Sequence, residues 1–217
     1  MAHPDPGRYA AGPTAIQHER LGTVPYEPTW RRMQRFTETR EPTAPDRLWT
    51  LQHPPVFTLG LNASREHLLN PGDVPVVPVD RGGQVTYHGP GQLVVYPLLD
   101  VRRREIGVRA LVSLLERAVV ELLAAEGVTA AARPDAPGVY VDGAKVASVG
   151  LRIRRGCSYH GLSVNVDMDL TPFSLINPCG HAGMPVTDLA GLGVSLSVEA
   201  VENRLADYLI DALEGRG

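Results

Sequence analysis

The spacing of apolar residues predicts three helices. Over residues 109–126 an apolar stripe recurs at helical intervals, and Gly127 follows as a typical C-terminal stop. Residues 27–40 carry large apolar side chains at the same spacing, which indicates a helix with one face in the core. Near the end of the chain, Ser197 is a suitable N-cap for an amphipathic helix that runs to about residue 213.

Most of the remaining pattern predicts strands. Asp142-Gly143 lies between two β-branched segments and suits the tight turn of a hairpin over residues 139–155. Two prolines within residues 74–80 confine that strand to a sheet edge or a strand end. The other predicted strands cover residues 21–26, 46–52, 56–59, 93–99 and 159–166, and residues 64–69 are a candidate short helix.

Strands and helices interleave along the chain without strict alternation. The pattern therefore predicts an α/β (α+β) fold in which a mixed β-sheet is flanked by helices. No internal repeat divides the chain, so residues 21–217 are expected to form a single domain. Residues 1–20 lack hydrophobic periodicity and are expected to form a flexible N-terminal tail.

Composition narrows the class of protein. The 217 residues carry a net charge of −3, which argues against a dedicated nucleic-acid-binding protein. No apolar run reaches the roughly 18 residues of a membrane span, so no membrane association is expected. The N-terminal residues lack the apolar core of a signal peptide, and two cysteines cannot build a disulfide framework. These features predict a cytoplasmic protein.

Lysine is almost absent from the chain. Of the 21 basic residues, all but Lys145 are arginine. Arginine stays protonated at any accessible pH, whereas a desolvated lysine can lose its proton. Lys145 is therefore a candidate for a site that gives and takes a proton. The alternative is a residue that remains by chance on a solvated turn.

A glycine-rich segment, RGGQVTYHGPGQ, covers residues 81–92. Glycine allows the backbone to approach a ligand closely, and free N–H groups in such loops can hold an oxyanion or a phosphate. Arg81 offers an anion contact, and His88 offers a group that titrates near neutral pH. The segment is not a P-loop, because no lysine follows its glycines. The alternative is a compact turn in which His88 is structural.

The two cysteines lie in different sequence contexts. Cys179 lies between a proline and a glycine in INPCGHAGMPVTD (176–188), the pattern of a shaped loop and hence of a functional thiol. Cys157 precedes a predicted strand and is interpreted as a small core residue. With His160 and His181 at no recognised ligand spacing, no metal site is expected.

Lys145 and Cys179 together suggest a catalytic pair. A free thiol with a pKa of about 8.5 is only about 3% thiolate at pH 7. An ammonium at about 4 Å and an effective dielectric of about 20 offers roughly 4 kcal/mol of attraction before desolvation is subtracted. Such a pair suits acyl transfer, in which a thiolate forms a covalent thioester that a second nucleophile resolves.

Four segments resemble the lipoyl(octanoyl) transferase family of lipoate biosynthesis. The likeness runs from about Leu21 to Leu213. The four segments, which occur in the family's order, are RGGQVTYHGPGQ (81–92), GVYVDGAKVASVGLR (138–152), HGLSVNV (160–166) and INPCGHAGMPVTDL (176–189). The resemblance implies the fold of the biotin and lipoate protein ligase catalytic module. It also implies that Cys179 is the acyl-thioester nucleophile and that Lys145 lowers its pKa. The implied substrate-binding residues are Arg81, Gly82, Gly83, Gln84, Val85, Thr86, Tyr87, His88, Ser148, Val149, Gly150, Gly161, Leu162 and Ser163.

The resemblance implies that an octanoyl group moves from octanoyl-acyl carrier protein to a specific lysine of a lipoyl domain. The implied acceptors are the lipoyl domains of 2-oxoacid dehydrogenase complexes and the glycine cleavage H protein. Since a thioester donor is already activated, no cofactor is expected. The alternatives are an ATP-dependent lipoate or biotin protein ligase of the same fold, a non-catalytic module that binds acyl carrier or lipoyl domains, and a general cysteine hydrolase, for which no orienting Asp or Asn is identifiable.

Two arginine clusters are candidates for docking acidic partner proteins. Residues 102–104 are three consecutive arginines, and Arg152, Arg154 and Arg155 form the second group. The alternative is that each cluster is simply a solvated run of charge.

Overall fold

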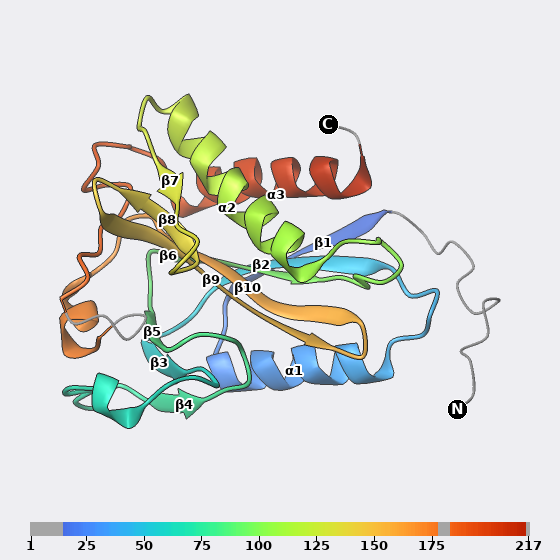
Figure 1. Cartoon of the computed structure of the whole chain (residues 1–217), viewed down its shortest axis with the longest axis horizontal. Helices are drawn as coiled ribbons and strands as arrows, with labels where there is room; N and C mark the ends of the chain where they lie inside the picture. Colours follow the sequence, from blue (N-terminus) through green and yellow to red (C-terminus); the bar gives the residue numbers. More distant parts are fainter. Residues whose placement is uncertain (1–14, 178–182, 216–217) are drawn as a thin grey trace.

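The computed structural model describes residues 15–177 and 183–215, and its centre is a seven-stranded mixed sheet (Figure 1). The strand order is β1-β2-β6-β10-β9-β8-β7, with β1 and β2 parallel and the other neighbours antiparallel. These strands are β1 (Ile16–Thr23), β2 (Asp46–Gln52), β6 (Gln92–Leu98), β7 (Ala131–Ala132), β8 (Gly138–Val141), β9 (Ala144–Arg154) and β10 (Cys157–Asn165). The predicted α/β fold with a mixed sheet is confirmed.

Helices cover both faces of this sheet. Helices α2 (Val108–Ala125) and α3 (Val198–Glu214) lie on one face, and α1 (Tyr26–Thr39) lies on the other (Figure 1). The alternation of side chains along β6 builds both cores: Leu93 and Val95 pack with α2 and α3, whereas Val94 and Tyr96 pack with α1.

A second sheet of three strands lies beside the first. Its order is β4-β3-β5, formed by β4 (Val76–Pro78), β3 (Val56–Leu59) and β5 (Val85–His88). The proline-containing strand is at the edge, as its sequence predicts. Among the described residues, the other regular elements are two short 3₁₀ helices, η2 (Arg65–His67) and η3 (Thr171–Leu175).

The predicted hairpin and cap are confirmed at residue level. Asp142 and Gly143 join β8 to β9 with positive φ angles of 47° and 81°, the conformation that a two-residue turn of this type requires. The Ser197 hydroxyl accepts a hydrogen bond from the Ala200 amide at 3.1 Å and caps α3.

The beginning of the fold differs from the prediction. The first described strand is Ile16–Thr23 rather than 21–26, and Tyr26 already opens α1. The expected boundary at residue 20 between tail and domain therefore falls inside a strand. This strand has a mixed burial pattern because it lies at the sheet edge beside β2, so its sequence carries little hydrophobic periodicity.

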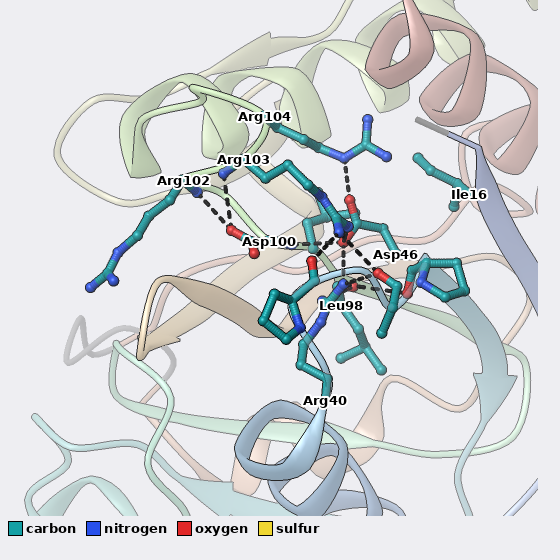
Figure 2. A network of polar contacts seen from close by, with 12 residues as sticks. Ile16, Arg40, Asp46, Leu98, Asp100, Arg102, Arg103 and Arg104 are labelled. Atoms are coloured by element: carbon teal, nitrogen blue, oxygen red, sulfur yellow. Dashed lines mark hydrogen bonds and ion pairs between the residues drawn. The ribbon is translucent and has the colours of Figure 1, made fainter. Parts of the chain in front are cut away.

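A buried carboxylate joins the ends of four elements (Figure 2). Asp46 is fully buried and accepts hydrogen bonds from Arg40 and Arg103 at 2.7 and 2.8 Å and from the Asp100 amide at 2.8 Å. Arg104 forms a further ion pair with the same carboxylate and donates to the Leu213 carbonyl at 2.7 Å. The carboxylate thereby links α1, β2, the segment after β6 and α3.

This carboxylate cluster corrects the prediction for residues 102–104. Arg103 and Arg104 are neither a docking surface nor a solvated charge run, because both side chains are 9% exposed and bind Asp46. Only Arg102 of the three is exposed. In the second cluster Arg152, Arg154 and Arg155 are exposed, and Arg154 pairs with Glu38 at 2.8 Å.

Within residues 15–177 and 183–215, no helix combines the length and apolar character needed to cross a membrane.

We expect Asp46→Asn to destabilise the fold by about 3–5 kcal/mol, because three guanidinium groups lose the buried anion that compensates them. Urea unfolding measures the difference. The control Glu38→Gln removes an exposed partner of Arg154 and should cost less than about 1 kcal/mol. Equal costs for the two variants would contradict the role assigned to Asp46.

Candidate active site

A cavity of about 450 Å³ lies where the two sheets meet. Its walls come from β5 and the loop before it, from β9 and β10, from the first turn of α2, and from residues 135–137. Apolar side chains such as Val94, Val112 and Leu162 alternate with polar ones in the lining. A concave and largely apolar space with a few convergent polar groups is typical of a small-molecule site.

The cavity brings together nearly all of the described residues that the sequence singled out. Those that line it are Arg81, Gly82, Gly83, Gln84, Val85, Thr86, His88, Lys145, Ser148, Val149, Gly150, Gly161, Leu162 and Ser163. Two of the three segments meet because β9 pairs with β10 in a register that sets Ser148 opposite Ser163 and Gly150 opposite Gly161. The third is joined to β9 where the Gly82 amide donates to the Leu151 carbonyl at 3.0 Å. Residues far apart in the sequence thus form one surface.

Tyr87 is the predicted residue that does not line the cavity. Its ring packs against Phe57 at 5.4 Å and Phe173 at 5.6 Å between centroids, on the other side of β5. Its neighbours on β5, Val85, Thr86 and His88, do line the cavity. Arg81 lines the cavity, and its guanidinium donates to the Thr58 and Gly82 carbonyls at 2.9 Å; the anion contact expected of it stays a prediction.

Lys145 is 3% exposed and lies at the cavity wall near the start of β9. Its backbone forms a parallel bridge with Val186: the Lys145 amide donates to the Pro185 carbonyl at 2.8 Å, and the Thr187 amide donates to the Lys145 carbonyl at 3.0 Å. The ammonium lies 5.4 Å from the centre of the Tyr140 ring. Both the N–H and the C=O of Lys145 are therefore bound to residues 185–187.

Gly138 makes room for the lysine side chain. A Cβ at this position would lie 2.6 Å from Lys145 Cε and 2.4 Å from the Ala147 carbonyl oxygen, and the φ of Gly138 is +141°. The Gly138 amide also donates to the buried Glu116 carboxylate at 2.8 Å. Glycine in this first position of β8 thus allows the aliphatic part of Lys145 to lie directly on the backbone.

Cys179 and His181 lie outside the described residues. The described ends of the chain on either side, Asn177 and Gly183, both line a smaller hollow that shares Phe173 and Val186 with the main cavity. Cys157, in contrast, begins β10 and is buried, and burial raises the pKa of its thiol. That environment agrees with its interpretation as an inert core residue.

An aspartate that the sequence did not indicate binds a histidine of the cavity wall. Asp80 accepts hydrogen bonds from Trp30 at 2.8 Å and from His160 Nε2 at 2.9 Å, and a further one from Tyr159. Burial alone would raise the pKa of Asp80, but the donors, His160 first, outweigh it and lower that pKa. His160 is held in the left-handed region, with φ of 58°, and lines the cavity.

Two further histidines in this region are held neutral. Burial lowers the pKa of His53 to about 4, and burial together with the nearby His53 lowers the pKa of His88 to about 3. His53 accepts from the Tyr96 hydroxyl at 2.8 Å because its Nδ1–H donates to the Val24 carbonyl. Tyr26 stacks on His88 at 5.6 Å between ring centroids. This part of the cavity is therefore polar without carrying imidazolium charge at neutral pH.

Sequence reasoning did not single out Tyr26, Asp80, Tyr96 and Asn165 as site residues. Tyr26 and Tyr96 follow the apolar pattern of their elements and give no sign of a cavity. The one available signal was proximity to the recognised segments, because Asp80 immediately precedes the glycine-rich loop and Asn165 is the second-last residue of HGLSVNV. Among the described residues, no cluster of three His, Cys, Asp or Glu side chains is arranged to hold a metal ion.

Solved structures identify the class to which this fold belongs. A bipartite lipoate protein ligase studied with its E2 lipoyl domain, from Thermoplasma acidophilum, superposes with a TM-score of 0.70 at 16% identity, covering 92% of this chain and 83% of that one. Biotin protein ligase from Aquifex aeolicus, in complex with biotin and ATP, gives 0.59 at 14% identity, covering 91% and 70%. The fold is that of the lipoate and biotin protein ligase catalytic modules.

Sequence comparison then gives the family. Residues 25–210 match the model of the lipoyl protein ligase A/B catalytic domain. The octanoyltransferase of Pseudomonas fluorescens (strain Pf0-1) is 60% identical over 202 residues, which cover 93% of this chain and 94% of that protein. The chain therefore belongs to the lipoyl protein ligase A/B catalytic domain family and, within it, to the octanoyltransferases. This confirms the recognised family and the expectation of an acyltransferase.

We expect Gly138→Ala to lower octanoyl transfer about 100-fold, because the added methyl group displaces Lys145 from the cavity wall. Steady-state transfer rates, with circular dichroism to verify folding, provide the measurement. Gly107→Ala is the matched control, since its Cβ meets nothing within 4 Å and its φ of −73° is ordinary. A folded Gly138→Ala variant with full activity would show that the position of Lys145 does not matter.

Proposed function

We propose that this chain transfers an octanoyl group from octanoyl-acyl carrier protein to a specific lysine of a lipoyl domain, through a thioester on Cys179. The observation that carries the proposal is the buried Lys145 in a cavity lined by the three described family segments. The 60% identity to an octanoyltransferase supports the acyl group and the reaction class. The fold shared with an archaeal lipoate protein ligase supports a lipoyl-type acceptor.

In the first half-reaction the Cys179 thiolate attacks the thioester carbonyl of the donor. The Lys145 ammonium lowers the pKa of Cys179 and so raises the thiolate fraction. Backbone N–H groups of the glycine-rich loop and of the segment around Cys179 stabilise the oxyanion. The carbon–sulfur bond to the donor breaks, and Lys145 gives its proton to the departing thiolate. Cys179 is left as the octanoyl thioester and Lys145 as a neutral amine.

In the second half-reaction the amine of the acceptor lysine attacks this thioester. Neutral Lys145 takes the proton that the amine loses as the amide bond forms, and Cys179 leaves as a thiolate. The pair thus returns to its starting protonation state. Arginine could supply the charge but not the proton cycle, which gives a chemical reason for lysine at position 145 in a chain that otherwise uses arginine.

The cavity lining suits an eight-carbon chain. Burying about six methylene groups and a methyl group contributes roughly 5 kcal/mol, at about 0.8 kcal/mol per carbon. Val149 and Leu162 offer apolar contacts, and Ser148 and Ser163 face one another across the β9–β10 pair. We assign substrate binding to these residues and to the loop from Arg81 to His88, with Tyr87 acting through packing.

The proposed acceptors are the lipoyl domains of 2-oxoacid dehydrogenase complexes and the glycine cleavage H protein. The rival activity on this fold is ATP-dependent ligation of free acid. Incubation of the enzyme with ATP, octanoate and a lipoyl domain, without acyl carrier protein, separates the two. Amide formation in that mixture would favour the ligase.

We expect wild-type enzyme incubated with octanoyl-acyl carrier protein to gain the mass of one octanoyl group. Intact-mass spectrometry detects the adduct, and peptide mapping places it on Cys179. The adduct should be absent from Cys179→Ser, whereas Cys157→Ser should retain it because that thiol is buried in the core. Transfer at the wild-type rate by Cys179→Ser would overturn the thioester pathway.

We expect Lys145→Arg to form the acyl-enzyme but to transfer it to the acceptor amine at least about 100-fold more slowly, because arginine keeps the charge and cannot accept the proton. Rapid-quench single-turnover assays resolve the two half-reactions. Lys145→Met, which lacks both charge and proton, should slow both steps. Near-normal turnover of Lys145→Arg would mean that only the positive charge is needed.

A further inference from the structure

A chain of amide hydrogen bonds connects His88 to the segment beside Lys145. His88 Nδ1 lies 2.7 Å from Gln92 Oε1, and Gln92 Nε2 donates to Asn165 Oδ1 at 2.9 Å. Asn165 Nδ2 donates to the Thr187 carbonyl at 2.9 Å. The Thr187 amide in turn donates to the Lys145 carbonyl. The three side chains are all buried, and β6 and β10 pair Gln92 directly opposite Asn165.

Backbone carbonyls at two points fix the direction of this chain. A carbonyl only accepts, so Asn165 must turn its NH₂ group to Thr187 and its oxygen to Gln92. Gln92 must then turn its NH₂ group to Asn165, and the same group donates to the Tyr87 carbonyl at 3.2 Å. The oxygen of Gln92 is left for His88, which must therefore carry its proton on Nδ1.

The other ring nitrogen of His88 is consequently a bare acceptor. His88 lines the cavity, and its Nε2 has no hydrogen-bond partner among residues 15–177 and 183–215. At the reacting centre of the proposed reaction, the octanoyl chain has no polar hydrogen and the thioester carbonyl needs donors. The attacking amine is the group that brings N–H donors to an acceptor nitrogen.

We propose that Gln92 and Asn165 are positioning residues that lock His88 in the Nδ1–H tautomer, so that His88 Nε2 accepts a hydrogen bond from the acceptor amine. This inference rests on the proposed function, and it assigns different roles to two residues in the second half-reaction. His88 orients the amine, and Lys145 takes its proton. The same chain of hydrogen bonds connects His88 to Lys145, since it ends on the backbone segment that pairs with Lys145.

The surroundings of His88 favour the neutral ring. Tyr26 stacks on it, His53 lies 5.9 Å away between ring centroids, and the Arg81 charge and His160 also act on it. Burial first, and then His53, lower the pKa of His88 to about 3, against the opposing effect of Gln92. The wild-type ring should therefore keep one tautomer through the working range of pH.

Histidine tautomers can be measured on the intact wild-type protein. In a long-range ¹H–¹⁵N correlation spectrum at neutral pH, we expect the His88 ring to carry its proton on Nδ1, with assignment by the signals lost in His88→Gln. A proton on Nε2, or on both nitrogens, would overturn the inference. This measurement does not depend on Cys179 or on any substrate.

The kinetic test is Gln92→Glu, which sets a carboxylate against His88 Nδ1–H. The neighbouring anion raises the pKa of His88, and a protonated ring offers a donor where the amine needs an acceptor. We expect the acid limb of the amine-transfer rate to move up by about one pH unit or more. Gln17→Glu adds the same charge on an exposed part of β1 and should leave the profile unchanged. Identical profiles for the two variants would overturn the inference.

Failure of the inference and failure of the proposed function give different results. If the wild-type enzyme forms no octanoyl adduct, the proposed function fails and the amine step assigned to His88 falls with it. If the adduct forms but Gln92→Glu resolves it with an unshifted pH profile, the proposed function stands and the role given to Gln92 is wrong.

Discussion

The site depends on one buried lysine. Burying an ammonium costs several kcal/mol unless the surrounding structure compensates it, and Lys145 is 3% exposed. The Tyr140 ring, whose centre lies 5.4 Å from the ammonium, offsets part of this cost, and the neighbouring backbone fixes the position of the residue. Gly138 lets the side chain lie on the backbone of β8, and the pairing with residues 185–187 fixes its own backbone. A cation held in this way can lower the pKa of a thiol, and it can lose its proton without a large movement.

Stability and chemistry occupy different parts of the same sheet. The ion pairs around Asp46 join the ends of α1, β2 and α3, whereas the cavity lies where β9 and β10 approach the small sheet. The first region stabilises the fold through permanently charged arginines that surround one buried carboxylate. The second region contains mainly uncharged rings and amides, together with the Arg81 guanidinium and the Asp80 carboxylate. Few of its groups change their protonation state near neutral pH, so few would compete with Lys145 for a proton.

Periodicity predicted the elements but not the cavity. The hairpin at Asp142-Gly143, the strand 56–59 and the cap at Ser197 follow from local chemistry, so the sequence indicated them correctly. The cavity lining arises from sheet register and tertiary approach, which no local pattern contains. For that reason no sequence pattern indicated the contacts of Asp80 and Asn165. The prediction for Arg103 and Arg104 was also wrong, because both are buried rather than on the surface. Composition singled out Lys145 as the one lysine of the chain, and the resemblance to a family gave it a role because such a comparison uses whole segments rather than local spacing.

Neutral polar groups around the cavity have a consequence for the proton balance of the proposed reaction. Lys145 alternates between ammonium and amine, and a second group titrating nearby would compete for the same proton. Burial keeps His53 and His88 uncharged, and Asp80 holds His160 in place by accepting a hydrogen bond from its Nε2. The proton released by the acceptor amine then has Lys145 as its destination. Among the described residues, the histidines near the cavity are thus uncharged at neutral pH, which favours Lys145 as the proton acceptor in the proposed reaction.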